Sequence, residues 1–249
     1  MRQSISVFYP MFLVLPVLAG IGGAAAAAVS PPLTGVDNAT AAGEAIVRQN
    51  CAACHAVDAI DYEALGVQER LDREAPPLYY AGNKYREQWL VEWLQGPKAI
   101  HPAGYLRLEV LQAVSQEDAV PNGEIVDHPE LNEDEAELAV EFLMSLRPHN
   151  DLLEASGYSA GETAMRMAML HFRRFNACSA CHRDEDGNGG ISGPELYTAG
   201  DRLQPQFLAS FIADPTAWDP HTAMPASGLN PGAVHRLADY LIMISEGSP

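Results

Sequence analysis

The pentapeptide Cys51-Ala-Ala-Cys54-His55 recurs as Cys178-Ser-Ala-Cys181-His182, and these two stretches decide what the chain must fold around. They contain all four cysteines, so no cysteine remains elsewhere in the chain for a disulfide, a metal site or a nucleophile. Two thiols with this spacing can reach both vinyl groups of one porphyrin, and the adjacent histidine then lies beneath the iron. The motifs therefore predict two covalently bound haem c groups.

A longer self-similarity surrounds the motifs. After a shift of 118 positions, Pro76-Pro-Leu-Tyr-Tyr-Ala-Gly82 falls on Pro194-Glu-Leu-Tyr-Thr-Ala-Gly200, and Gly43-Glu44 falls on Gly161-Glu162. The two cysteine motifs are instead offset by 127 positions, so nine extra residues precede the second motif and nine follow the first. A repeat of this length predicts two copies of one domain rather than a solenoid.

The apolar spacing predicts an all-α fold made of two tandem helical domains related by internal duplication. We expect the first domain at residues 38–148 and the second at 157–249, linked near Arg147 to Ser156, where Pro, His, Asn and Asp break the pattern. No segment alternates convincingly as a strand. In the first half, helices are expected at 41–50, at 86–95 and from Asn132, with Glu135 at the third position of the last one. In the second half, they are expected at 163–176, after a capping box of Ser159 and Glu162, at 204–213 and from Asn230.

Residues 1–28 have the layout of a secretory signal peptide. Arg2 gives a positive start, Phe8 to Leu18 is apolar, and Ala26-Ala27-Ala28 offers a cleavage site. An uncleaved membrane anchor is the alternative. Cleavage predicts an exported, periplasmic protein that is soluble or only peripherally associated with a membrane.

The formal net charge of -18 limits the partners. It argues against nucleic acid and against an anionic membrane surface, and it favours redox protein partners with a basic docking surface. Life at high salt would explain the same composition.

The second half resembles a class I cytochrome c domain. The resemblance rests on an N-terminal helix, on the haem motif, on Gly193-Pro194-Glu195-Leu196, on Met224-Pro225 and on a C-terminal helix ending at Asp239-Tyr240-Leu241. It implies that Met224 is the distal iron ligand and that Pro194 helps to orient the His182 imidazole. The chain as a whole resembles the dihaem cytochromes c over roughly residues 38 to 246.

The distal ligands differ between the halves. In the second, Met224 is the candidate and His221 its nearest competitor. In the first, the repeat places Leu106 at the position of Met224, and leucine cannot bind iron. His128 precedes the closing helix much as Met224 does, with His101 or an open site as alternatives. The expected iron ligands are therefore His55, His128, His182 and Met224.

These ligands predict electron transfer between redox partners through a low-potential His/His haem and a high-potential His/Met haem. From Leu108 to Leu146 there are eleven Asp or Glu residues and no Lys or Arg, which also favours ferric iron in the first half. The alternative is a dihaem oxidoreductase with an accessible first haem, acting on sulfur compounds or peroxide. Asp184 to Glu195 matches the spacing of a calcium-binding loop, although Gly193-Pro194 would break the helix that should follow.

Overall fold

The computed structural model describes residues 35–71, 75–101 and 128–246. The expected signal peptide and Leu106 lie outside these residues. Within them, no helix is both long enough and apolar enough to cross a membrane. Regular structure is predominantly helical, in agreement with the predicted all-α class.

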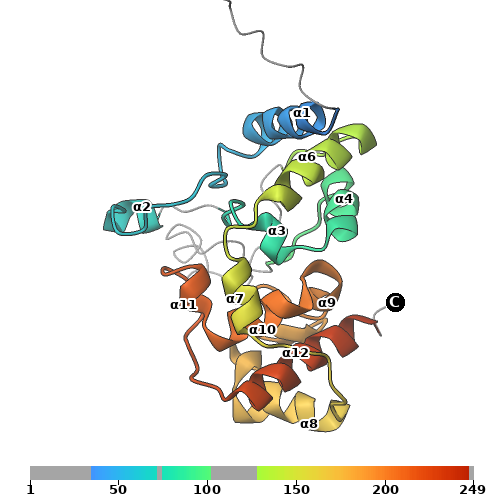
Figure 1. Ribbon diagram of the computed structural model, residues 1–249. Helices are drawn as coiled ribbons and strands as arrows, with labels where there is room; N and C mark the ends of the chain where they lie inside the picture. Colours follow the sequence, from blue (N-terminus) through green and yellow to red (C-terminus); the bar gives the residue numbers. More distant parts are fainter. Residues whose placement is uncertain (1–34, 72–74, 102–127, 247–249) are drawn as a thin grey trace, which may run out of the picture. The chain divides into compact units, whose positions relative to one another are not determined.

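In the first half, the helices pack around α6, a Glu133–Ser145 helix. Asn132 accepts a hydrogen bond from the Glu135 backbone N–H and the Glu135 side chain accepts one from the Asn132 N–H, so a capping box forms at the helix start that the sequence predicted. Figure 1 shows α1 beside α6, with α3 and α4 against the same helix. The other helices are α1 (Gly35–Asn50), α2 (Val67–Leu71), α3 (Ala81–Lys84) and α4 (Glu87–Gln95).

The second half is arranged around α12 (Pro231–Glu246), which packs against α8, α9 and α10. Asn230 caps α12 by accepting a hydrogen bond from Ala233 N–H at 3.0 Å. The expected helix at 204–213 is observed as α10 (Pro205–Ala213). The remaining elements are α8 (Met165–Leu170), the π-helix η1 (His171–Phe175), the 3-10 turn η2 (Cys178–Ala180), strands β1 (Arg183–Glu185) and β2 (Asn188–Gly189), α9 (Ala199–Arg202) and α11 (Pro215–Trp218).

Four local features differ from what the sequence predicted. The Ser159 and Glu162 capping box does not form, because the helix begins only at Met165 and its N-cap Ala164 makes no side-chain hydrogen bond. The last turn before the second motif is a π-helix, and Ala177 then has a left-handed φ of 53°. The expected break between the domains contains a short helix, α7 (Asn150–Ala155), and β1 and β2 form a small antiparallel hairpin.

The two halves meet at positions that the 118-residue repeat makes equivalent. Tyr85 and Leu203 form an isolated antiparallel bridge, flanked by Arg86 N–H donating to Arg202 O and Gln204 N–H donating to Lys84 O, both at 2.9 Å. One side chain from each half also donates a hydrogen bond to a backbone carbonyl of the other half. Arg86 Nε donates to Leu203 O at 3.1 Å, and Gln204 Nε2 donates to Tyr85 O at 2.8 Å. The contact therefore has local two-fold pseudosymmetry.

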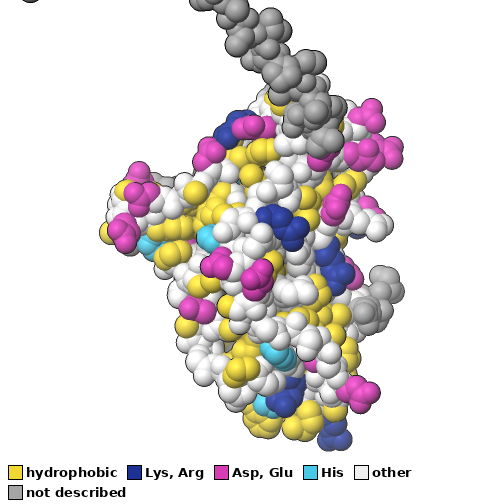
Figure 2. Space-filling model, in the orientation of Figure 1, with side chains coloured by type: hydrophobic (Ala, Val, Ile, Leu, Met, Phe, Trp, Pro, Cys, Tyr) yellow, Lys and Arg dark blue, Asp and Glu magenta, His cyan; other side chains and the backbone are white. Residues whose placement is uncertain are grey.

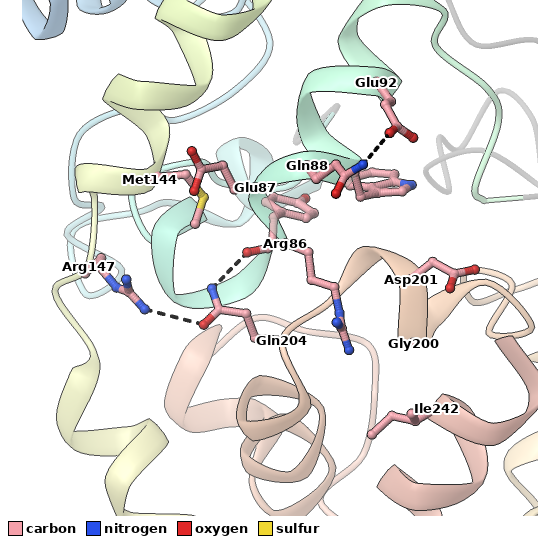
Figure 3. A pocket seen from close by; sticks show the side chains of 12 residues that line it. Arg86, Glu87, Gln88, Glu92, Met144, Arg147, Gly200, Asp201, Gln204 and Ile242 are labelled. Carbon is pink, nitrogen blue, oxygen red and sulfur yellow. Dashed lines mark hydrogen bonds between the residues drawn. The ribbon is translucent and has the colours of Figure 1, made fainter. Parts of the chain in front are cut away.

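A pocket with a volume of about 680 Å³ lies beside this bridge. Figure 3 shows the side chains that line it. Gln204 lies between the halves there, donating to Gly82 O at 2.7 Å and accepting from Arg147 at 3.4 Å. The residues that the structure describes belong to one compact unit, so the two halves pack together.

A buried aromatic cluster completes the junction. Tyr80 of the first half lies 5.5 Å from Trp218 and 6.4 Å from Phe207 of the second, measured between ring centroids. His149, just before α7, packs on edge against Trp218 at 5.6 Å. Tyr80 and Trp218 are only 2% and 1% exposed. Aromatic pairs in this geometry add stability beyond the area they bury.

Helix packing in the first half requires glycine at position 43. A Cβ at Gly43 would collide with the Leu138 carbonyl oxygen of α6. At Gly161, its partner in the repeat, the nearest atom to an added Cβ is the Asp239 carboxylate at 3.6 Å. We therefore expect Gly43→Ala to lower the free energy of unfolding by about 1–3 kcal/mol, as overpacking does.

Gly161→Ala is the matched control and should change the free energy of unfolding by less than about 0.5 kcal/mol, like an ordinary surface substitution. Chemical denaturation of both variants measures the difference. Equal stabilities for the two variants would show that the close approach of α1 to α6 is wrong.

His149 should make the fold sensitive to acid. Burial lowers its pKa from the ordinary value of 6.5, and Asp151 opposes this only in part. The unfolded chain then binds a proton more readily than the folded one, so stability is full above pH 6.5 and falls as the pH drops below it. Thermal unfolding between pH 7.5 and pH 5 should therefore show a shallower decline for His149→Phe, which keeps a ring in the cluster. Parallel declines for the two proteins would exclude this role.

Candidate functional site

Each motif histidine makes the same hydrogen bond on its Nδ1 side. His55 Nδ1 lies 2.7 Å from Pro76 O, and His182 Nδ1 lies 2.8 Å from Pro194 O. A carbonyl oxygen can only accept, so Nδ1 carries the hydrogen and Nε2 keeps its lone pair. Since Pro76 and Pro194 are equivalent in the repeat, both histidines are held in the tautomer that binds a metal through Nε2.

The cysteines of each motif lie on one tight turn. His55 N–H donates to Cys51 O at 2.9 Å, and His182 N–H donates to Cys178 O at 3.0 Å. In both turns the first cysteine faces the interior and the second is exposed. All four thiols are free of disulfides. Each turn thus presents two thiols and an imidazole from one short segment.

The motif histidines are neutral in their surroundings. Burial lowers the pKa of His55 and of His182, although the proline carbonyls oppose the shift. The positive charge of Lys84 lowers the pKa of His55 further, and that of Arg202 does the same for His182. Lys84 and Arg202 are equivalent in the repeat. Neutral imidazole is the form that ligates iron.

His128 lies opposite the first motif. Its ring centroid is 6.3 Å from that of His55, with an angle of 75° between the planes. His128 is partly buried, and burial lowers its pKa. The expected pair of His55 and His128 is therefore brought together, across the 73 positions that separate them in the sequence.

His101, the alternative ligand of the first haem, is near the second motif. Burial and the nearby His182 lower the pKa of His101 to about 4, so His101 is close to the second motif. The His221 ring packs on edge against Tyr62 at 5.1 Å. Met224 is partly buried between α11 and α12, and its N–H donates to Thr222 Oγ1 at 3.2 Å.

The acidic residues at the two ends of the possible calcium loop are already engaged. Asp184 accepts from Arg173 Nε at 2.8 Å, and Glu195 pairs with the buried Arg202 at 3.4 Å. Among the residues that the structure describes, no group of three His, Cys, Asp or Glu side chains is placed to hold a metal ion. These two carboxylates bind Arg173 of the π-helix and Arg202 of α9 instead, which argues against a calcium site.

The donor atoms at both motifs fit a covalently bound haem. Each has unpaired thiols in the required spacing and an imidazole whose Nε2 is left for iron. In the second motif, a Cβ at Gly193 would collide with the His182 ring, so glycine is needed there. When bound, haem c would be held by Cys51, Cys54 and His55 in one half and by Cys178, Cys181 and His182 in the other, and it would supply a one-electron redox centre.

Sequence reasoning missed two features of the sites. Trp93 packs on edge against His128, with ring centroids 4.6 Å apart, and Arg202 and Glu195 form a buried pair beside His182. The spacing of Tyr85, Trp89 and Trp93 along one helix face was a usable signal for the first. Nothing in the sequence indicated the second.

The comparison with known families supports part of this picture. Residues 40–147 match the family model described as Cytochrome c. The match includes the first motif and His128 and ends before the second motif. Neither the curated proteins nor the solved structures gave a match. Residues 40–147 are thus similar to the Cytochrome c family, and this match supports covalently bound haem c and haem-based electron transfer in that part of the chain.

Proposed function

We propose that the protein is a periplasmic dihaem cytochrome c that passes electrons between redox partners. Its first haem would have His55 and His128 as axial ligands, and its second His182 and Met224. The observation that carries the proposal is the repeated hydrogen bond from a motif histidine to a proline carbonyl, at 2.7 Å and 2.8 Å. Because of this hydrogen bond, the motif histidine of the second half has the same tautomer as the one in the segment that matches the Cytochrome c family.

The position of His128 supports a His/His first haem. Two imidazoles that bind one metal from opposite sides have ring centroids roughly 6 Å apart, because each nitrogen lies about 2 Å from the metal. The 6.3 Å between His55 and His128 agrees with this value. A second imidazole lowers the reduction potential relative to a thioether, so electrons would enter at the first haem and leave from the second.

The same distance speaks against the alternative of a dihaem oxidoreductase. An enzyme needs an iron with an exchangeable or missing ligand, and the first haem was the only candidate. With His128 facing His55, little space remains for a sulfur compound or peroxide on that side.

The charge distribution supports a basic partner. Figure 2 shows acidic side chains over α2 and over the start of α6, where Glu133, Asp134 and Glu135 form the first turn. A partner with Lys or Arg at its docking face would be attracted to this region, and added salt would weaken the attraction.

The number of haems can be tested directly. Intact mass and haem content of the purified protein should correspond to two covalently bound haems, attached to the peptides containing Cys51 and Cys178. The double variant Cys178→Ala, Cys181→Ala should retain one. A wild-type protein with a single haem would overturn the dihaem proposal and leave the cytochrome c domain intact.

The ligands can be tested by redox titration with electron paramagnetic resonance. The wild-type protein should show two midpoint potentials and two low-spin ferric signals. His128→Met should raise the lower potential, because a thioether stabilises ferrous iron better than imidazole does. His128→Ala should make that iron high-spin and able to bind cyanide.

Two matched substitutions complete the ligand test. Met224→Ala should affect only the higher potential, and His101→Ala should preserve both low-spin signals. A single midpoint potential, or an unchanged spectrum in His128→Ala, would contradict the ligand assignment.

A further inference from the structure

Trp93 lies in direct contact with the proposed distal ligand of the first haem. Its ring meets the His128 ring on edge at 4.6 Å. Trp93 is also the last member of a stack that begins at Tyr85, just before α4, and continues through Trp89 and Trp93 of that helix, at 5.8 Å and 5.7 Å between centroids. The stack holds the Trp93 ring against His128.

The indole N–H of Trp93 points to the next segment of chain. Nε1 donates to Lys98 O at 3.1 Å, across the Gly96-Pro97 turn that ends α4. The segment that carries His128 is tied to the same helix end, since Leu131 N–H donates to Leu94 O at 3.0 Å. Trp93 therefore connects the His128 side of the first site to residues 98–101.

Residues 98–101 continue to the second site. Ile100 O accepts a hydrogen bond from Glu195 N–H at 2.8 Å. Glu195 follows Pro194, whose carbonyl accepts from His182 Nδ1 at 2.8 Å. The Glu195 carboxylate is buried and paired with Arg202, so this end is held firmly. The two hydrogen bonds lie on either side of one peptide unit.

We propose that this chain of contacts is the route by which an electron moves between the two iron sites. It runs from His128 through Trp93 and residues 98–100 to Pro194 and His182. The inference rests on the proposed dihaem function. The step would be the transfer of one electron from the haem that Cys51, Cys54 and His55 would hold to the haem that Cys178, Cys181 and His182 would hold, so that the first is oxidised and the second reduced. No proton or group is transferred, and no side chain on the route is itself oxidised.

The two halves of the repeat are not equivalent along this route. The residue equivalent to Trp93 in the second half is Phe211, whose side chain has no N–H to donate. The residue equivalent to Glu195 in the first half is Pro77, which has no backbone N–H. The equivalent of Trp89 is Phe207. The halves thus differ at the two donors that the route needs, although the surrounding helices are the same.

The test uses the complete haem-loaded protein and two phenylalanine variants. Trp93→Phe keeps a ring against His128 and removes the donor to Lys98 O. Trp89→Phe keeps an aromatic ring in the stack that positions Trp93 and removes an indole that is not on the route, so it is the matched control. Rapid photoreduction followed by absorption of each haem measures the rate of intramolecular electron transfer. We expect this rate to fall several-fold in Trp93→Phe and to stay at the wild-type value in Trp89→Phe.

Ligation must be checked in the same samples. Paramagnetic resonance spectra and midpoint potentials should match the wild type, which shows that His128 is still bound. Replacement of Trp93 by benzothienylalanine keeps the shape of the indole and lacks its N–H, and it should slow the transfer as Phe does. Equal rates in all proteins would overturn the route. Failure of the dihaem proposal would be seen separately, as a missing haem or a missing low-spin signal in the wild type.

Discussion

The hydrogen bond from each motif histidine to a proline carbonyl is the contact on which the rest of the molecule depends. It selects the tautomer, and it works only if the proline segment stays in place. That segment ends at Gly82 in one half and Gly200 in the other. A Cβ at Gly82 would collide with Met144 O, and one at Gly200 would lie 2.7 Å from Ile242 Cα. The closing helices thus press directly on the segments that orient the imidazoles, which explains why these segments are the most alike between the halves.

Local signals predicted what short stretches of chain decide. The ends of α4 and α10, the caps at Asn132 and Asn230, and the buried faces of the closing helices follow from side chains within a few residues. The π-helix, the aromatic junction around Tyr80 and Trp218, and the contact of Trp93 with His128 depend on partners far away in the sequence. Pairing of His55 with His128 was predictable only by counting back from the closing helix. The short α7 was missed because its sequence reads as a break, yet packing on α10 stabilises it.

The positions at which the two halves of the repeat differ are the most informative. Backbone contacts at Tyr85 and Leu203 are nearly symmetric, because both halves use the same turn to meet. Side chains that serve one site only are asymmetric: Arg202 and Glu195 form a buried pair beside His182, whereas the first half has Lys84 and Pro77 at these positions. A buried ion pair fixes a specific arrangement more than it adds stability. We therefore attribute the shared contacts to folding and the unshared ones to the different tasks of the two sites.

Rigidity of the junction has a direct consequence for electron transfer. A mobile linker would make the separation of the two motifs variable, and the rate of transfer would follow the fraction of time spent in close arrangements. Here the linker helix α7 is fixed by Ser210 Oγ, which donates to Leu152 O at 3.0 Å and accepts from Trp218 Nε1 at 2.9 Å. Asn83 binds the other end of the linker through Asn150 and the His149 N–H. With both ends held, the relative position of the two motifs is set by folding, and the proposed electron transfer would need no domain closure.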